Sequence, residues 1–94
     1  MTEQPLHVEE TESSVAEEVQ LPAKVILFND EVHSFEEVIT QIIKATGADL
    51  ARAEALTWEV HNAGKAAVYE GEMTTCVRVS HVLEEIDLIT QIEM

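Results

Sequence analysis

From residue 24 onward, short runs of hydrophobic residues alternate along the chain with segments in which hydrophobic residues recur every three or four positions. The segment Lys24–Asn29 is short, apolar and bounded by turn formers, which predicts a buried strand. Ser34 is a strong N-cap, and Glu37 three residues later completes a capping-box signature. The apolar positions after Ser34 repeat at helical spacing up to Gly47, a left-handed stop, and predict one buried helix face made of Phe35, Val38, Ile39, Ile42 and Ile43.

A second helix is predicted immediately after this stop. Asp49 is expected to cap the helix, and Gly64 is expected to end it shortly after Asn62. Its inner face is expected to consist of residues of moderate size, namely Leu50, Ala53, Leu56, Thr57 and Val60.

The last part of the chain predicts two strands with a helix between them. Lys65–Glu70 alternates weakly between apolar and polar residues, which favours a strand. Thr74 or Thr75 is expected to cap a third helix, and Leu88–Ile92 is expected to form the final strand. The expected inner positions of the third helix are Val79, Val82, Leu83 and Ile86.

The resulting order β-α-α-β-α-β is typical of a small α+β fold, in which we expect a three-stranded antiparallel sheet packed against helices on one face. Residues 24–94 are assigned to one domain of about 70 residues, near the lower size limit for a core without disulfides or metals. Residues 1–23 contain both prolines of the chain, few large apolar side chains and no lysine or arginine. We interpret them as a disordered acidic extension, because they cannot bury enough apolar surface to offset their ordering entropy.

The charge balance narrows the classes of partner. The chain of 94 residues has 19 acidic side chains against 5 lysines and arginines, a formal net charge of −14. Phosphate backbones and anionic membranes need clustered positive charge, so nucleic acid and membrane surfaces are not expected partners. A cationic ligand or a basic protein surface fits better, and a purely solubilising role of the acidity stays open.

Cysteine usage and the short apolar runs indicate a cytoplasmic protein. Cys76 is the single cysteine, so the chain has no internal disulfide. The longest unbroken run of large apolar residues, Val25–Phe28, is far too short to span a bilayer, and the chain does not begin with a basic and then apolar leader. We expect no cofactor and no catalytic role, because the sequence has no nucleophile–base spacing or phosphate-binding glycine loop.

Polar acceptor side chains gather where the first strand is expected to end. Asn29, Asp30 and Glu31 follow the apolar run directly, and His61 lies near the end of the second helix, just before Gly64. Amide, carboxylate and neutral imidazole groups accept hydrogen bonds, and such a set suits a cationic amine. On spacing alone, a simple turn at Asn29-Asp30 and a histidine that only stabilises a helix end stay open as interpretations.

The segment KVILFND followed by a capped helix, together with VH-x-x-GK at this separation, resembles the ClpS family of adaptors that deliver N-degron substrates to Clp AAA+ proteases. The resemblance extends from Lys24 to Met94 and includes the order of elements, and the acidic extension stands where the family has a flexible N-terminal segment. It implies recognition of a free N-terminal residue and delivery to an unfoldase of the ClpA or ClpC type, without catalysis by the adaptor.

The resemblance also implies roles for individual residues. Asn29 matches the family's Asn that accepts a hydrogen bond from the α-amino group, Asp30 matches the acid that contacts the start of the peptide backbone, and His61 matches the His that completes the ring of acceptors. Arg78 stands near the family's basic residue for docking to the unfoldase. The pocket for the first side chain corresponds to Phe35, Val38, Thr57, Val60 and Leu88.

Three positions depart from the residues that are common in the family. His33 stands where the family commonly has Thr, and Phe35 and Thr57 stand where it commonly has Met. Phe is stiffer than Met, and Thr is smaller and polar, so the pocket is expected to have a different shape. Leu, Phe, Tyr or Trp is still the expected first residue of a bound chain. Because His61 accepts a hydrogen bond only when it is neutral, binding is expected to weaken below about pH 6.5.

Three alternative functions stay open at this point. The first is a ClpS-like fold that regulates the unfoldase without binding N-degrons. The second is an interaction module like the C-terminal domain of the ribosomal stalk protein, although that domain has lysine-rich helices and the first two helices here carry only Lys44 and Arg52. The third is a small enzyme or metal-binding protein that uses His33, His61 and nearby acids. Zinc sites usually show tighter patterns of Cys and His than the residues available here, which are Asp30, Glu31, His33 and His61.

Overall fold

The computed structural model describes residues 22–94, in which strands and helices follow one another in the predicted order. The elements are β1 (Ala23–Phe28), α2 (Phe35–Thr46), α3 (Leu50–Ala63), β2 (Lys65–Gly71), α4 (Met73–Glu84) and β3 (Thr90–Glu93). The predicted α+β class is confirmed, while most of the predicted acidic extension lies outside the described residues. Within residues 22–94, no helix combines the length and the apolar character needed to cross a membrane.

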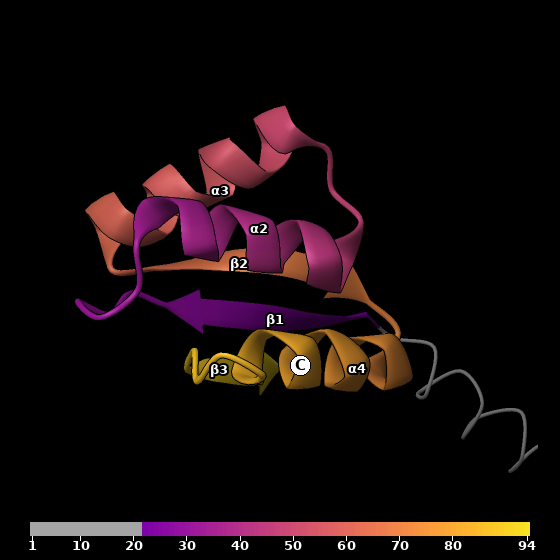
Figure 1. The fold of residues 1–94 in the computed structure, drawn as a ribbon. Helices are drawn as coiled ribbons and strands as arrows, with labels where there is room; N and C mark the ends of the chain where they lie inside the picture. The colour runs from indigo at the N-terminus through magenta and orange to yellow at the C-terminus, as the bar shows by residue number, and fades with distance from the viewer. Residues whose placement is uncertain (1–21) are drawn as a thin grey trace, which may run out of the picture.

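The central strand of the sheet is β1, with β2 along one edge and β3 along the other, both antiparallel to it (Figure 1). Leu27 of β1 pairs with Ala66 in β2 and with Thr90 in β3. Because β1 has a neighbour on both sides and is covered on one face, Val25 and Leu27 have no exposed surface. The point at which the chain leaves β1 is therefore held firmly by the sheet.

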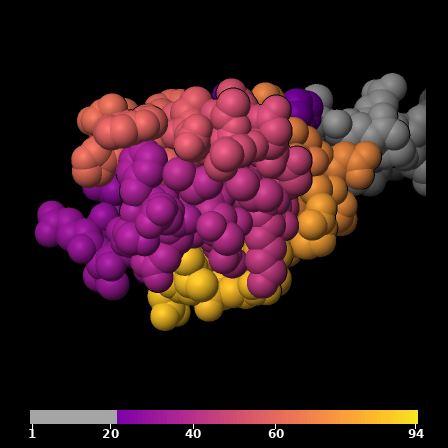
Figure 2. All heavy atoms as spheres, turned by 45° about the horizontal axis from the view of Figure 1, so that its top comes forward, coloured from indigo at the N-terminus to yellow at the C-terminus, as the bar shows by residue number. Residues whose placement is uncertain are grey.

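The helices pack on one face of this sheet. α4 contacts all three strands, α3 contacts β2, and α2 contacts both α3 and α4. At the start of β1, Lys24 is exposed between the buried Ala23 and Val25, whereas Val25, Ile26 and Leu27 are all buried. Figure 2 shows α2 across the middle of the helical side, between α3 and the C-terminal residues. The core lies between the helices and one face of the sheet, as the sequence predicts, and its largest fully buried side chains are Leu27, Ile42, Leu83, Val25, Val79 and Cys76.

The ends of α2 and α3 follow the signals in the sequence. Ser34 caps α2 through a reciprocal pair of bonds, in which the Glu37 N–H donates to Ser34 Oγ (3.1 Å) and the Ser34 N–H donates to Glu37 Oε1 (2.7 Å). Asp49 caps α3 with its side chain. Gly47 and Gly64 end the two helices in the left-handed region, with φ of 77° and 88°. These predicted boundaries are confirmed.

The predicted start of α4 was wrong. The helix begins at Met73, with Glu72 at the N-cap, rather than after Thr74 or Thr75. Glu72 makes no side-chain capping bond, but Met73 packs against the core, and the Cys76 N–H donates to the Glu72 carbonyl (2.9 Å). Packing of the first turn therefore outweighs the capping preference of the threonines.

The predicted final strand was placed too early in the sequence. The strand spans Thr90–Glu93 instead of Leu88–Ile92, because the chain turns at Asp87, which has a φ of 66°. Leu88 is buried in the connecting segment, and Ile86 packs against the core after the end of α4 rather than within it. The apolar residues Ile86 and Leu88 therefore pack against the core from the segment that connects α4 to β3 and do not belong to a strand.

Leu50 was predicted to face the core, but its side chain is 58% exposed. It is the first residue of α3, and Figure 1 shows that this end of the helix rises away from the sheet. The other predicted inner positions of α3 are buried, namely Ala53, Leu56, Thr57 and Val60. The inner face of α3 therefore begins one turn after its first residue, at Ala53.

Candidate functional site

A pocket of about 410 Å³ opens at the end of the sheet where the chain leaves β1. Its walls come from the end of β1, the segment that follows, the first turns of α2, the last turns of α3 and the segment before β3. Every residue predicted to contact a bound N-terminal residue lines this pocket: Asn29, Asp30, Phe35, Val38, Thr57, Val60, His61 and Leu88. The structure therefore brings these distant parts of the sequence to one place.

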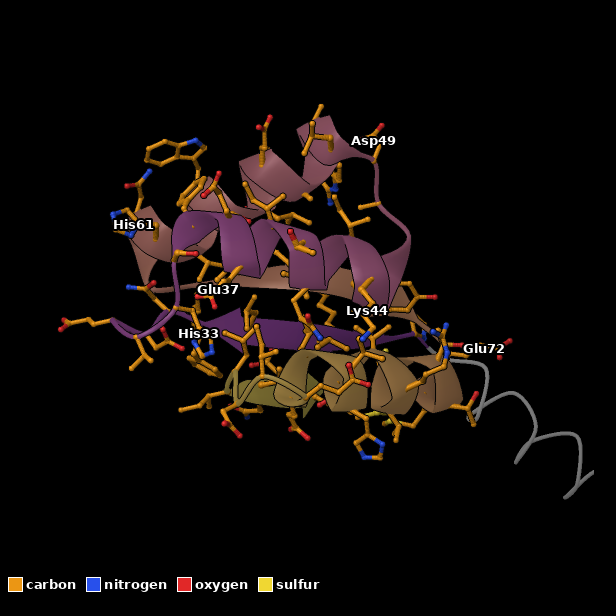
Figure 3. The ribbon with its side chains drawn as sticks, viewed as in Figure 1. His33, Glu37, Lys44, Asp49, His61 and Glu72 are labelled. Carbon is orange, nitrogen blue, oxygen red and sulfur yellow. The ribbon has the colours of Figure 1, made fainter. Side chains whose placement is uncertain are left out.

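The polar end of the pocket is fixed by a backbone contact between β1 and α3. The N–H of Asn29 donates to the carbonyl of Gly64 (2.9 Å), just beyond the last turn of α3 that carries His61. Because Gly64 ends α3 in a left-handed conformation, the chain reverses there and enters β2 beside β1. Asn29 and His61 are consequently held at the same end of the sheet, and Figure 3 shows His61 and His33 at this end.

The deep wall of the pocket is apolar. Val60 and Leu88 are buried, and so is Thr57, which is only 3% exposed. The Thr57 hydroxyl donates to the carbonyl of Ala53 within α3 (2.7 Å). Its donor is therefore satisfied inside the helix, and the residue acts as a small, largely apolar part of the wall.

An aromatic cluster closes one side of the pocket. The ring of Phe35 lies 4.6 Å from that of Trp58 in a tilted arrangement and 6.4 Å from that of His61, edge to face. Trp58 and His61 are also edge to face, with centroids 6.1 Å apart. Trp58 is 55% exposed and so lies at the edge of α3. Phe35 is thus held between two rings, a more fixed position than a flexible Met side chain would have.

The carboxylate of Asp30 organises the segment after β1. Its Oδ1 accepts the backbone N–H groups of Val32 and His33, both at 3.0 Å, and its Oδ2 lies 2.7 Å from His33 Nδ1. Partial burial works to raise the pKa of Asp30, but these hydrogen bonds and the charge of His33 outweigh it, so the pKa is lowered. Asp30 is therefore ionised at neutral pH and holds a turn beside Asn29.

The imidazole of His33 links this turn to the opposite wall. Its Nε2 is hydrogen-bonded to the carbonyl of Ile86, in the segment that leads to Leu88, and its side chain is only 12% exposed. The hydrogen bond with Asp30 raises the pKa of His33, which outweighs the opposite effect of its partial burial. Sequence reasoning identified His33 as a departure from the family pattern but did not place it in the pocket.

Other pocket residues were also missed. They lie close to the predicted acceptors, so nearness to Asn29 and Asp30 in the sequence was the available signal: Leu27, Phe28, His33 and Ser34. Glu31 adds a second carboxylate beside the acceptor pair. Glu31 is among the acceptors expected from the sequence, so both acidic side chains predicted after the first strand lie at the pocket.

The residue proposed for docking to the unfoldase and the possible metal ligands were also predicted from the sequence. Arg78 is exposed on α4 and does not line the pocket. Within residues 22–94, no three His, Cys, Asp or Glu side chains converge in a way that could hold a metal ion. Both ring nitrogens of His33 face acceptor oxygens of Asp30 and Ile86, so in this arrangement neither nitrogen is directed at a metal.

Comparison with known proteins places this chain in a family. Residues 18–87 match the family model described as ATP-dependent Clp protease adaptor protein ClpS. Among curated proteins, the chain is similar to E3 ubiquitin-protein ligase UBR1 of Mus musculus, with 35% identity over 72 residues and 71% of this chain covered. UBR1 of Homo sapiens matches at 33% identity over the same extent. The chain spans 4% of the length of each of these relatives.

A solved structure has the same fold. The structure of Agrobacterium tumefaciens ClpS2 bound to L-phenylalaninamide aligns with a TM-score of 0.73 and 18% identity, covering 79% of this chain and 96% of that chain. This likeness supports the arrangement of strands and helices. Because the family model matches most of the sequence, from residue 18 to residue 87, this chain belongs to the ClpS family of Clp protease adaptor proteins.

Proposed function

We propose that this chain is an adaptor that binds N-degron proteins through their free α-amino group and hydrophobic first side chain and delivers them to a ClpA- or ClpC-type AAA+ unfoldase. The observation that carries the proposal is one pocket with hydrogen-bond acceptors at one end and a buried apolar wall at the other. The adaptor itself performs no catalysis. The Agrobacterium ClpS2 structure of the same fold contains L-phenylalaninamide, which joins a free amine to an aromatic side chain.

The polar end suits a protonated amine. An α-amino group has a pKa of about 8 and is largely cationic at neutral pH, so it offers three donors. Asn29 provides an amide oxygen and His61 a ring nitrogen, while Asp30 keeps one lone-pair direction on Oδ2. Hydrogen bonds to a charged group contribute roughly 1.5–3 kcal/mol each. An internal peptide amide lacks the charge and two of the donors, so it would leave these acceptors unpaired.

The apolar end suits a large first side chain. Val60 and Leu88 form buried surfaces of the wall, and Thr57 presents no free hydroxyl donor. Fully burying a side chain such as Leu or Phe contributes about 1.5–3 kcal/mol through the hydrophobic effect. A polar first side chain would gain none of this and would lose its hydration. We therefore propose Leu, Phe, Tyr or Trp as the recognised residues.

Alanine variants of the acceptors test the proposed roles. Asn29→Ala and His61→Ala each remove one acceptor for a charged donor, so the Kd for a peptide that begins with Phe is expected to rise about tenfold or more. Isothermal titration calorimetry measures the affinity and the stoichiometry together. Asn62→Ala is the matched control, because Asn62 is exposed on the last turn of α3 and does not line the pocket. Equal Kd values for Asn29→Ala and Asn62→Ala would contradict the role proposed for Asn29.

Delivery to the unfoldase is proposed to involve the exposed Arg78 on α4. A reporter protein that begins with Phe is expected to be degraded faster by a ClpA- or ClpC-type unfoldase and its peptidase when the chain is present. Arg78→Glu is expected to slow this degradation while leaving peptide affinity unchanged. Peptide binding without any acceleration of degradation would instead favour a different acceptor for the bound substrate.

A further inference from the structure

The carboxylate of Asp30 is largely occupied within the protein. Oδ1 accepts two backbone N–H groups, and Oδ2 pairs with the imidazole of His33 at 2.7 Å. A carboxylate has about four lone-pair directions, so one remains for a ligand. Asp30 therefore contributes to the site chiefly by fixing the turn that carries Asn29, and His33 is the side chain through which this turn is attached to the rest of the pocket.

His33 lies between two acceptors. Nδ1 faces the Asp30 carboxylate, and Nε2 faces the carbonyl oxygen of Ile86. A neutral imidazole has only one N–H and can satisfy only one of these oxygens, whereas the imidazolium donates to both. The charged groups that influence the ring are the carboxylates of Asp30 and Glu37, and both favour its cationic form.

The bridge joins two walls of the pocket that are far apart in the sequence. Asp30 belongs to the segment after β1, while Ile86 belongs to the segment between α4 and β3, two residues before the buried Leu88. The backbone bond from the Phe28 N–H to the Ile89 carbonyl (3.0 Å) joins the last residue of β1 to the segment that contains Leu88. Beyond Phe28, the His33 side chain is the hydrogen-bonded link between the acceptor turn and the Leu88 segment in the described residues.

We propose that His33 is a positioning residue for N-terminal recognition, because its imidazolium bridge from Asp30 to Ile86 holds the acceptor turn against the Leu88 wall in the geometry that binds a free N-terminus. This role rests on the proposed function of the pocket. When His33 loses its proton, one of the two bonds is lost and the turn is no longer fixed at both ends. The protonated form of His33 therefore favours binding. His61, in contrast, accepts a bond from the amine only through a ring nitrogen without a proton.

The bridge makes binding depend on the protonation state of His33. Binding is expected to fall at alkaline pH as His33 loses its proton and one bond of the bridge is lost. The raised pKa of His33 extends the favourable range upward from the ordinary value of about 6.5. The ligand amine also loses its charge above a pH of about 8, but this affects every variant equally and cancels in a ratio of affinities.

The test compares the peptide affinity of the full chain with that of its His33→Gln variant. The affinity is measured from about pH 5 to about pH 9, roughly the range over which His, Cys and α-amino groups titrate. Gln keeps one donor for the bridge but does not titrate. Anisotropy of a labelled peptide that begins with Phe gives each Kd. At slightly acidic pH the original chain is expected to bind about 3- to 10-fold more tightly than His33→Gln, and the ratio is expected to approach one as His33 deprotonates. Circular dichroism confirms that the variant is folded.

A second measurement separates positioning from simple structural damage. The titration of the His33 ring is followed by NMR without peptide, in the original chain and in Asp30→Asn. Removal of the Asp30 charge is expected to lower the pKa of His33. The alkaline limb of the binding curve, that is, the pH range in which affinity falls as His33 loses its proton, is expected to shift to lower pH by the same amount. A structural defect alone would weaken binding at every pH without moving that limb.

The outcomes distinguish this inference from the proposed function. A constant affinity ratio between the original chain and His33→Gln over the whole pH range, with intact binding of the peptide, would overturn the positioning role only. An alkaline limb that stays in place in Asp30→Asn while the His33 titration moves would overturn it as well. Failure of the original chain to bind the peptide at any pH would overturn both the positioning role and N-terminal recognition.

Discussion

The hydroxyl of Thr57 is bonded to the Ala53 carbonyl and not directed to a ligand as a free donor (2.7 Å). At the scale of single residues, such local bonds decide what a side chain offers to the pocket. In the sequence, Thr57 stands at a position where Met is expected from the resemblance, and it is the more polar residue. In the structure it is buried in α3 with its hydroxyl bonded within the helix, so it acts as a small apolar residue of the pocket wall. The pocket therefore gains room at this position and keeps its apolar character.

Two substitutions at Thr57 test this interpretation. Thr57→Val removes the hydroxyl and keeps the size, so the Kd for a peptide beginning with Leu or Trp is expected to change by no more than about twofold. Thr57→Met fills part of the pocket, so a peptide beginning with Trp is expected to lose about tenfold in affinity and a peptide beginning with Leu much less. Anisotropy titration of the two peptides gives both ratios.

A large loss of affinity in Thr57→Val would show that the hydroxyl contacts the ligand after all. Equal losses for the Trp and Leu peptides in Thr57→Met would show that this wall does not limit the size of the bound side chain. The Asn62→Ala variant again serves as the reference for an exposed change on the same helix.

At the scale of elements, the stop of α3 positions the polar end of the site. Gly64 has a φ of 88°, and its carbonyl accepts the N–H of Asn29. Gly47 ends α2 in a similar conformation, with a φ of 77°, and does not line the pocket. A Cβ at either position meets no atom within 4 Å, so a substitution causes only backbone strain. The two glycines therefore form a natural pair of matched sites.

Gly64→Ala and Gly47→Ala are each expected to lower the free energy of unfolding by about 1–2 kcal/mol, because an L-residue is strained in the left-handed region. Chemical denaturation measures this loss. Only Gly64→Ala is expected to weaken binding of a peptide that begins with Phe, by several-fold, since only Gly64 holds the backbone of Asn29. Equal affinities in the two variants would contradict this link between the helix stop and the site.

At the scale of the whole molecule, most of the fold could be predicted because its signals are local. The capping box at Ser34, the stops at Gly47 and Gly64 and the apolar run of β1 set the order of elements directly. The start of α4 could not be predicted, because packing of Met73 against the core decides it. Tertiary contacts of this kind override local capping preferences.

The residues that line the candidate site could be predicted from the sequence, but the hydrogen bond that joins two of its walls could not. The predicted pocket residues came from the resemblance to a family, and the structure gathers them around one cavity, while their roles in binding stay predictions. The bridge of His33 to Ile86 could not be predicted, since it joins residues 53 positions apart through a backbone carbonyl. Neither residue type nor spacing indicates such a contact. The occupied state of Asp30 differs in this respect, because its bonds go to Val32 and His33 and agree with the turn that the sequence left open at Asn29-Asp30.

The most direct test of N-terminal recognition compares one fluorescent peptide that begins with Phe in two forms, with a free amine and with an acetylated amine. The two forms differ only in the charge and the donors at the N-terminus, so anisotropy titration isolates the contribution of the acceptors. The free form is expected to bind at least about 100-fold more tightly, because acetylation removes two donors and the charge. Equal binding of the two forms would contradict recognition of the free α-amino group and leave this chain as a ClpS fold with another role.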